Sequence, residues 1–265
     1  MELSKDDLTS LPLYLKSNLE EEIFLKCFEN QLPVMLKGPT GCGKSQFVEY
    51  MACKLGRPLI KVACNEDTNA ADLLGRFIIK NNDTVWQDGP VVRAIKESAI
   101  IYFDEIAESR EDVIVALHPL TDHRREVYLD KINKVVKASE KFMVVASFNP
   151  GYQSGLREMK PSTRQRFVTI AMDYLNEKNE AVLLSSLTGI SSSEAQALVK
   201  LAKMIRTSEN FDLSASVSTR LIIHTAMLMK AGISSRRAAH VSIAEALTDD
   251  RQIASALMDL IDLSL

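Results

Sequence analysis

One short glycine-rich stretch limits what this chain can fold into. Residues 38–45 read Gly-Pro-Thr-Gly-Cys-Gly-Lys-Ser, which fits the pattern GxxxxGK[ST]. The stretch follows an apolar run at 32–36 and opens a helical pattern at 44–55, which Gly56 and Pro58 close. A strand, a glycine-rich turn and a helix in this order present backbone N–H groups and a helix N-terminus to phosphate. An accidental glycine-rich turn would lack the flanking elements, so the sequence predicts a phosphate-binding loop.

The residue types within this loop predict individual roles. Lys44 can reach the β- and γ-phosphates of a bound nucleotide, and the Ser45 hydroxyl can ligate Mg²⁺. Cys42 is expected to fill the turn as a small residue, with a redox switch as the alternative. The predicted ATP-binding residues are Gly38, Pro39, Thr40, Gly41, Cys42, Gly43, Lys44 and Ser45.

A second motif lies downstream, where residues 100–105 read Ile-Ile-Tyr-Phe-Asp-Glu. An acid at the end of a neighbouring strand can hold the Mg²⁺ shell, which is the role expected of Asp104 together with Ser45. Glu105 can then polarise the attacking water as a general base. Two acids after a strand would by themselves indicate a solvated turn. Combined with the phosphate-binding loop, they indicate nucleotide hydrolysis.

The chain alternates between short apolar runs and helical patterns up to about Tyr174. Runs rich in β-branched residues suit inner strands of a parallel sheet that is covered on both faces. These runs lie at 32–36, 59–64, 99–103, 142–148 and 167–171. We therefore expect an α/β fold, a P-loop core with a parallel sheet between helices, over residues 1–174. Hairpin insertions are expected near 71–91 and 125–137.

Beyond this core, only amphipathic helical patterns occur, so residues 175–265 are expected to form an all-helical lid subdomain. Apolar residues recur on one helical face at Leu198, Leu201, Ala202 and Ile205, and again at Ile253, Leu257, Leu260 and Ile261. In the first hairpin segment, the runs 73–79 and 84–86 flank Asn81-Asn-Asp83, a hairpin signature. The only tryptophan, Trp86, is expected either to face a substrate or to pack under this hairpin.

Composition excludes several classes of function. The net charge of −3 gives no electrostatic case for nucleic acid as a partner. No apolar run approaches the roughly 20 residues that span a bilayer, and the N-terminus lacks the pattern of a secretory signal. The four cysteines lack metal-binding spacing and fit a reducing cytoplasm: Cys27, Cys42, Cys53 and Cys64.

Three further stretches complete an ordered set of motifs. A buried run ends at Asn149, residues 162–167 read Ser-Thr-Arg-Gln-Arg-Phe, and residues 216–221 read Ser-Val-Ser-Thr-Arg-Leu. With these motifs in this order, nearly the whole chain resembles the MoxR-type ATPases of the AAA+ superfamily. The resemblance implies that Asn149 is sensor 1 and that Arg220 is sensor 2. It also implies an arginine finger at Arg164 or Arg166, with Arg166 in the Arg-Phe pair as the better candidate.

More specific stretches narrow the resemblance to the CbbQ/NorQ branch, and closest to CbbQ. These stretches lie at 36–44, 118–122, 149–154 and 156–167. The branch implies a homohexameric ring with an adaptor that carries a von Willebrand factor A domain, as CbbO does. CbbQ-type members release inhibitory sugar phosphates from rubisco, whereas NorQ-type members assist nitric oxide reductase. The segments 71–91 and 125–137 resemble the helix-2 insert and the hairpin before sensor 1.

The expected function is therefore Mg²⁺-dependent ATP hydrolysis that drives remodelling of a client protein. A metabolic P-loop kinase shares the loop around Lys44, but it has no use for a finger acting on a neighbour. A scaffold that only binds nucleotide would not need Asp104 and Glu105. A DNA-dependent AAA+ protein would require a basic stripe that this sequence does not show.

Overall fold

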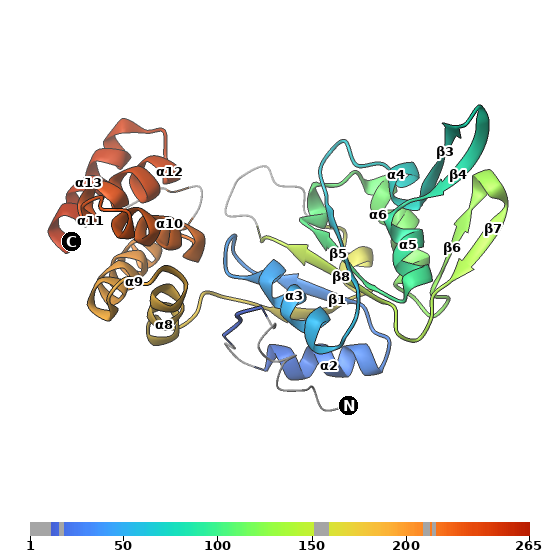
Figure 1. Ribbon diagram of the computed structural model, residues 1–265, viewed down its shortest axis with the longest axis horizontal. Coiled ribbons are helices and arrows are strands. Elements are labelled where there is room, and N and C mark those ends of the chain that lie inside the picture. The colour runs from blue at the N-terminus through green and yellow to red at the C-terminus, as the bar shows by residue number, and fades with distance from the viewer. Residues whose placement is uncertain (1–11, 16–18, 151–158, 209–212, 214–215) are drawn as a thin grey trace. The chain divides into compact units, whose positions relative to one another are not determined.

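The computed structural model describes residues 12–15, 19–150, 159–208, 213 and 216–265 (Figure 1). The chain divides into two compact units. The first comprises Met1–Lys37, Lys44–Asn149 and Leu156–Ala171, and the second comprises Gly38–Gly43, Pro150–Gly155 and Met172–Leu265. Parts of the segments 149–154 and 156–167 that carry the CbbQ resemblance lie outside the described residues. The domain boundary at 174 stays a prediction.

The first unit is built on a five-stranded parallel sheet with the strand order β2-β5-β8-β1-β9. Its strands are β1 (Val34–Lys37), β2 (Leu59–Ala63), β5 (Ile100–Asp104), β8 (Met143–Phe148) and β9 (Val168–Ala171). Each of the five apolar runs in the sequence overlaps one of these strands. The predicted α/β fold with a parallel sheet is therefore confirmed.

Both faces of this sheet are covered, because successive side chains of a strand point to opposite sides. On one face, Met35, Ile101 and Phe103 join a core cluster with residues of α5 (Pro90–Glu97) and α6 (Glu111–Leu117). On the other face, α3 (Lys44–Lys54) contacts β5 and β8 (Figure 1). The three central strands are almost entirely buried, which explains why they read as continuous apolar runs.

The remaining elements of the first unit are short. They are α2 (Glu20–Glu29), α4 (Ala70–Leu74), η1 (Ile106–Glu108), η2 (His118–Leu120), η3 (Asp130–Ile132) and α7 (Pro161–Arg164). The predicted helix at 44–55 is confirmed by α3. The sequence interpretation was wrong at residues 73 and 74, which we placed in a strand. They end helix α4, whose N-cap Asn69 accepts from the backbone N–H of Asp72.

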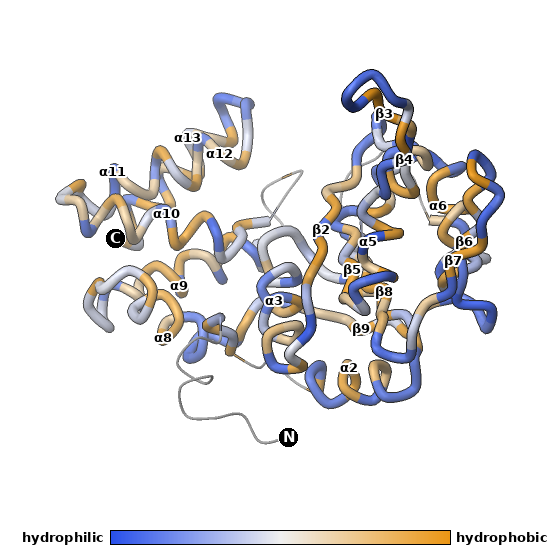
Figure 2. The backbone as a smooth tube through the Cα atoms, turned by 45° about the vertical axis from the view of Figure 1, so that its right-hand side comes forward, coloured by the Kyte–Doolittle hydropathy of each residue, from blue (hydrophilic) through white to orange (hydrophobic). Residues whose placement is uncertain are grey.

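Two antiparallel hairpins stand apart from the main sheet: β3 (Gly75–Lys80) with β4 (Asp83–Asp88), and β6 (Glu126–Leu129) with β7 (Lys134–Lys137). In the first, Asn81 and Asn82 both have positive φ, as a two-residue hairpin turn requires. The tip of this hairpin is hydrophilic (Figure 2). At its base Trp86 is half-buried against the first unit's core, whereas Phe77, directly opposite, is 46% exposed.

The second unit contains only helices in its described part. They are α8 (Glu177–Thr188), α9 (Ser192–Thr207), α10 (Thr219–Lys230), α11 (Ser235–Ala239), the π-helix η4 (His240–Ala244), α12 (Glu245–Leu247) and α13 (Arg251–Ser264). Asn176, Ser191, Ser218 and Asp250 cap the N-termini of α8, α9, α10 and α13 through their side chains. The two predicted apolar faces are confirmed, since Leu198, Leu201, Leu257 and Ile261 are fully buried in one core.

The cysteines are free thiols, and burial raises the pKa of Cys27 and of Cys64. Within the described ranges, no helix is both long enough and apolar enough to cross a membrane.

Candidate nucleotide site

The edge of the sheet at the end of β5 brings several predicted site residues together. Asp104 is the last residue of β5, and its Oδ2 accepts a hydrogen bond from the Ser45 hydroxyl at 3.2 Å. Ser45 lies in the first turn of α3, directly after the phosphate-binding loop. Two side chains that are far apart in sequence thus meet where parallel strands end, as the motif spacing predicts.

Two residues that sequence reasoning missed complete the surroundings of Asp104. Ser147 donates from its hydroxyl to Asp104 Oδ1 at 2.6 Å, and Tyr102 donates to the same oxygen at 2.8 Å. The Tyr102 hydroxyl also lies 3.2 Å from Ser45 Oγ. Burial raises the pKa of Tyr102 far above its ordinary value, so it stays a hydrogen-bond donor. In the sequence, Tyr102 and Ser147 could have been recognised as residues with a hydroxyl group inside otherwise apolar strands.

Glu105 occupies an unusual backbone conformation next to this cluster. Its φ of 55° and ψ of 47° lie in the left-handed region, which costs a non-glycine residue about 1–3 kcal/mol. The strain is held by specific contacts. The Glu105 N–H donates to Ser147 Oγ at 2.9 Å, and Asn149 Nδ2 donates to Glu105 Oε1 at 2.9 Å. The predicted general base and the predicted sensor 1 are therefore in direct contact.

The phosphate-binding loop has the backbone that its glycines allow. Gly41 and Gly43 have φ values of 71° and 98°, where side chains are disfavoured. A Cβ on Gly38 would lie 2.3 Å from the carbonyl oxygen of Met172, so only glycine fits there. Lys44, at the end of the loop, is 7% exposed.

Within the second unit, the same loop packs against the start of α10. A Cβ on Gly41 would lie 2.5 Å from the Ser218 Cβ, and the Tyr174 hydroxyl donates to the Thr40 carbonyl oxygen at 3.1 Å. Arg220, the predicted sensor 2, follows two residues after Ser218 and is exposed. A cavity of about 410 Å³ opens beside the loop. Its lining is Pro39, Asp173, Tyr174, Lys203, Ile205, Arg206, Thr207, Ser208, Leu213 and Ser216.

The two candidate arginine fingers differ in their surroundings. Arg164, the last residue of α7, is exposed. Arg166 is half-buried, and its Nη1 lies 3.3 Å from Asp122 Oδ2. Neither arginine belongs to the cluster around Asp104. The structure therefore brings Ser45, Asp104, Glu105 and Asn149 into one group, and Arg164 and Arg166 lie outside it.

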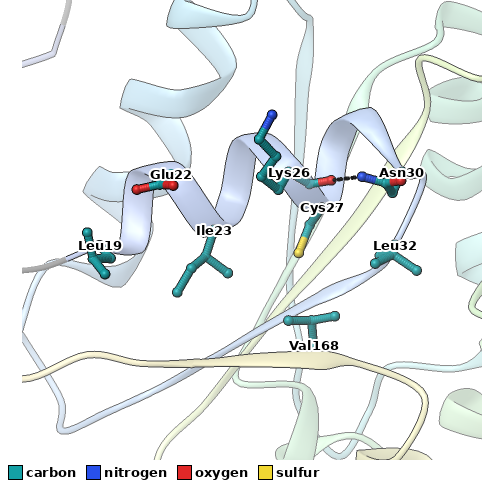
Figure 3. A pocket seen from close by; sticks show the side chains of 8 residues that line it. All are labelled: Leu19, Glu22, Ile23, Lys26, Cys27, Asn30, Leu32 and Val168. Atoms are coloured by element: carbon teal, nitrogen blue, oxygen red, sulfur yellow. Dashed lines mark hydrogen bonds between the residues drawn. The ribbon is translucent and has the colours of Figure 1, made fainter.

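A second cavity, of about 310 Å³, contains none of the predicted site residues (Figure 3). It lies along α2 and is lined by Leu19, Glu22, Ile23, Lys26, Cys27, Asn30, Leu32 and Val168. Its polar groups, Glu22, Lys26 and Asn30, all come from one side of α2 or its C-terminal end, and Asn30 Nδ2 donates to the Lys26 carbonyl.

The residues at the sheet edge fit Mg²⁺ and a nucleotide phosphate. Mg²⁺ prefers oxygen ligands and is usually held by one or two carboxylates together with substrate phosphates. Ser45 and Asp104 offer a hydroxyl and a carboxylate oxygen 3.2 Å apart. Asn149 Oδ1 is buried and has no hydrogen-bond partner among the described residues, so it can accept from a bound group.

Comparison with known proteins identifies two matching families. The family described as AAA domain (dynein-related subfamily) matches residues 33–167, and the family described as CbbQ/NirQ/NorQ C-terminal matches residues 180–264. A crystal structure of a candidate ATPase from Cytophaga hutchinsonii covers 96% of this chain and 92% of its own with a TM-score of 0.53. Its sequence is 15% identical, so it supports the fold alone.

Curated relatives match over almost their whole length. The denitrification regulatory protein NirQ of Pseudomonas aeruginosa is 48% identical, covering 95% of this chain and 97% of its own. Protein NorQ of Paracoccus denitrificans is 47% identical, with 94% and 92% covered. Protein CbbQ of Hydrogenophilus thermoluteolus is 45% identical, with 94% and 93% covered. The predicted branch is confirmed: this chain belongs to the CbbQ/NirQ/NorQ family of AAA+ ATPases.

Proposed function

We propose that this protein hydrolyses ATP with Mg²⁺ and uses the energy to remodel a client protein. The observation that carries the proposal is the hydrogen-bonded cluster that joins Ser45, Asp104, Glu105 and Asn149 at one edge of the sheet. A kinase needs no such contact between a strand-end glutamate and a neighbouring asparagine. A scaffold that only binds nucleotide would have no reason to keep Glu105 in a strained backbone conformation.

The bound Mg²⁺ would neutralise charge on the phosphates and orient them for attack by water. Ser45 and Asp104 are the proposed ligands, and Tyr102 and Ser147 fix the direction of the Asp104 carboxylate. Glu105 takes the proton of the attacking water. Asn149 holds one Glu105 oxygen, which leaves the other oxygen to accept that proton.

The phosphates rest on the backbone N–H groups of residues 38–45, with Lys44 at the β- and γ-phosphates. We propose that the cavity beside Pro39 receives the base, because the aromatic ring of Tyr174 and the apolar Ile205 line it. Arg220 on α10 would contact the γ-phosphate as sensor 2.

Hydrolysis is proposed to require a ring of subunits, because Arg166 or Arg164 acts on the nucleotide of a neighbour. Arg166→Ala should bind ATP normally and hydrolyse it poorly. Lys44→Ala should lose nucleotide binding but still carry a finger. Mixing the two variants tests the proposal, since some interfaces then pair an intact Arg166 with an intact loop. If mixed rings form and no hydrolysis returns, Arg166 does not act on a neighbour.

We propose rubisco as the client and an adaptor with a von Willebrand factor A domain as the partner. The argument rests on the resemblance of residues 118–122 and 151–167 to CbbQ-type proteins. The relatives named NirQ and NorQ are as similar as CbbQ, at 48%, 47% and 45% identity. Nitric oxide reductase is therefore the second candidate client.

Reconstitution separates the two clients. The protein, its adaptor and ATP are added to rubisco that is blocked by an inhibitory sugar phosphate, and recovery of carboxylation is measured. A parallel assay follows activation of nitric oxide reductase. Glu105→Gln, which retains the nucleotide-binding loop, is the control in both assays. Recovery in only the reductase assay would overturn the rubisco proposal and leave the ATPase proposal intact.

A further inference from the structure

Asp122 lies between two arginines in the first unit. Its carboxylate accepts from Arg124 Nε at 3.1 Å through Oδ1 and from Arg124 Nη2 at 2.7 Å through Oδ2. The same Oδ2 accepts from Arg166 Nη1 at 3.3 Å. The hydrogen bonds from Arg124 hold the pKa of Asp122 well below its usual range. Asp122 is therefore a carboxylate at neutral pH, and the contact to Arg166 is charge-assisted.

The ion pair of Asp122 with Arg166 is less exposed than an ordinary surface ion pair. The side chain of Asp122 is 19% exposed and that of Arg166 is 31% exposed. Arg166 Nε is buried and lacks a hydrogen-bond partner in the described part of the chain. Asp122 is the one acceptor that the described residues offer to this guanidinium. Without it, the direction of the guanidinium would be set by packing of the side chain alone.

A second contact holds α7, the short helix that precedes Arg166. His118 Nε2 lies 3.2 Å from Thr163 Oγ1, and Thr163 is the third residue of α7. Burial and the nearby Arg166 charge lower the pKa of His118, so its imidazole is neutral at physiological pH. The segment from His118 to Asp122 thus holds the α7 region at two points, one before and one after Arg164.

The segment that holds Asp122 is itself anchored. Arg125 directly precedes β6 and has a positive φ of 49°. Its guanidinium donates to the carbonyl oxygens of Gln31, Ser139 and Phe142 at 2.8, 2.9 and 2.8 Å. Burial lowers the pKa of Arg125, although not enough to remove its charge. Asp122 therefore lies three residues before a side chain that is bound to the backbone of the first unit, which supports a positioning role.

From this geometry we propose that Asp122 is the positioning residue for the arginine finger at Arg166. Asp122 accepts from one Nη and fixes the plane of the guanidinium, which leaves its other Nη free to reach the phosphate of a neighbouring subunit. The same carboxylate accepts from Arg124, and the next residue, Arg125, donates to three carbonyl oxygens near the base of the β6–β7 hairpin. The inference rests on the proposed role of Arg166 in the ring.

Two other roles of Asp122 predict different results. A structural ion pair would change stability without acting through Arg166. A carboxylate that sequesters Arg166 would inhibit hydrolysis, so its removal would raise turnover. A positioning carboxylate instead makes Asp122→Asn behave as a weaker version of Arg166→Ala.

The test measures ATP hydrolysis by the assembled protein. Asp122→Asn should lower kcat about tenfold or more and leave KM for ATP within about twofold, because the finger contacts the phosphate mainly in the transition state. Asp112→Asn is the matched control. Asp112 pairs with Arg110 at the surface and is 56% exposed, so the control should retain the kcat of the unmodified protein.

Mixing of variants tests whether Asp122→Asn impairs hydrolysis at the nucleotide site of a neighbouring subunit. Asp122→Asn subunits mixed with Lys44→Ala subunits should regain hydrolysis, because Lys44→Ala supplies an intact Asp122 and Arg166. Mixed with Arg166→Ala subunits, they should regain none, because neither variant supplies a working finger. Recovery with Arg166→Ala would place the defect in the subunit's own nucleotide site and overturn the proposal. Unchanged or increased kcat in Asp122→Asn would overturn it too.

The mixing result also separates this inference from the ring proposal. If Arg166→Ala is not rescued by Lys44→Ala while mixed rings form, the trans role of Arg166 fails for every variant. If Arg166→Ala is rescued and Asp122→Asn is not, only the positioning role of Asp122 fails.

Discussion

Breaking the buried ion pair between Glu180 and Arg206 should strongly destabilise the second unit. Glu180 is 1% exposed, and its two carboxylate oxygens accept from Arg206 Nη1 and Nη2 at 2.8 and 2.9 Å. Glu180 Oε1 also accepts from the Thr219 hydroxyl at 2.6 Å. Arg206 lies over the ring of Tyr174 at 3.8 Å and donates from Nε to the Val217 carbonyl oxygen.

Arg206→Met removes one partner and leaves a buried carboxylate whose remaining side-chain partner among the described residues is the Thr219 hydroxyl. Breaking a buried pair in this way costs about 3–5 kcal/mol. The lost stacking on Tyr174 adds to this cost, and the flexible methionine side chain offsets part of it by filling the space. We expect a loss of about 3–5 kcal/mol in the free energy of unfolding, measured by urea denaturation and followed by circular dichroism.

Two matched variants test the reasoning. The double variant Glu180→Gln with Arg206→Met should recover part of the loss, because an amide is less costly to bury than a carboxylate and still accepts from Thr219. Lys203→Met breaks the exposed pair of Lys203 with Glu177, whose side chains are 56% and 50% exposed, and should change stability by less than about 1 kcal/mol. A loss below about 1 kcal/mol in Arg206→Met, or a double variant no more stable than the single one, would refute the argument.

Four further changes test the site and the first hairpin. Glu105→Gln should keep ATP binding and lower turnover by about 10²-fold or more, and near-normal turnover would remove Glu105 as the base. Gly41→Ala should weaken ATP binding and destabilise the fold more than Gly56→Ala does. Both glycines have positive φ, but only a Cβ on Gly41 would meet a neighbouring atom, at 2.5 Å. Equal losses of stability in the two variants would contradict the packing argument. Trp86→Ala should cost about 3 kcal/mol. Phe77→Ala should cost far less and abolish client remodelling, and retained remodelling would exclude Phe77 as a client contact.

The sequence predicted the strands and the ends of strands well, because both depend on local pattern. Apolar runs of five to seven residues identified β1, β5 and β8, and the polar residues that follow the β5 and β8 runs are the predicted site residues Asp104, Glu105 and Asn149. Parallel strands end at one edge, so these residues had to lie near each other. The phosphate-binding loop was identified by its own glycines.

Contacts between side chains distant in sequence could not be predicted. Ser147 reads as one small polar residue in an apolar strand, and only the pairing of β8 beside β5 shows that it contacts Asp104. Asp122 and Arg166 are 44 residues apart, and no local pattern relates them. Glu180 looks like an exposed residue in the first turn of α8, yet it is buried by Arg206 from α9.

The strand β8 connects the parts of the proposed active site. Ser147 is the fifth residue of β8 and Asn149 is the first residue after the strand, so both lie where β8 ends at the edge of the sheet. Ser147 contacts Asp104 and the backbone N–H of Glu105, and Asn149 contacts the carboxylate of Glu105. Because β8 lies between β5 and β1, it borders both the strand that carries the acids and the strand that leads into residue 38. Through Ser147 and Asn149, the β8 segment contacts both acids, the proposed Mg²⁺ ligand Asp104 and the proposed general base Glu105. These contacts hold the two acids together at the sheet edge, although Glu105 has a left-handed backbone conformation.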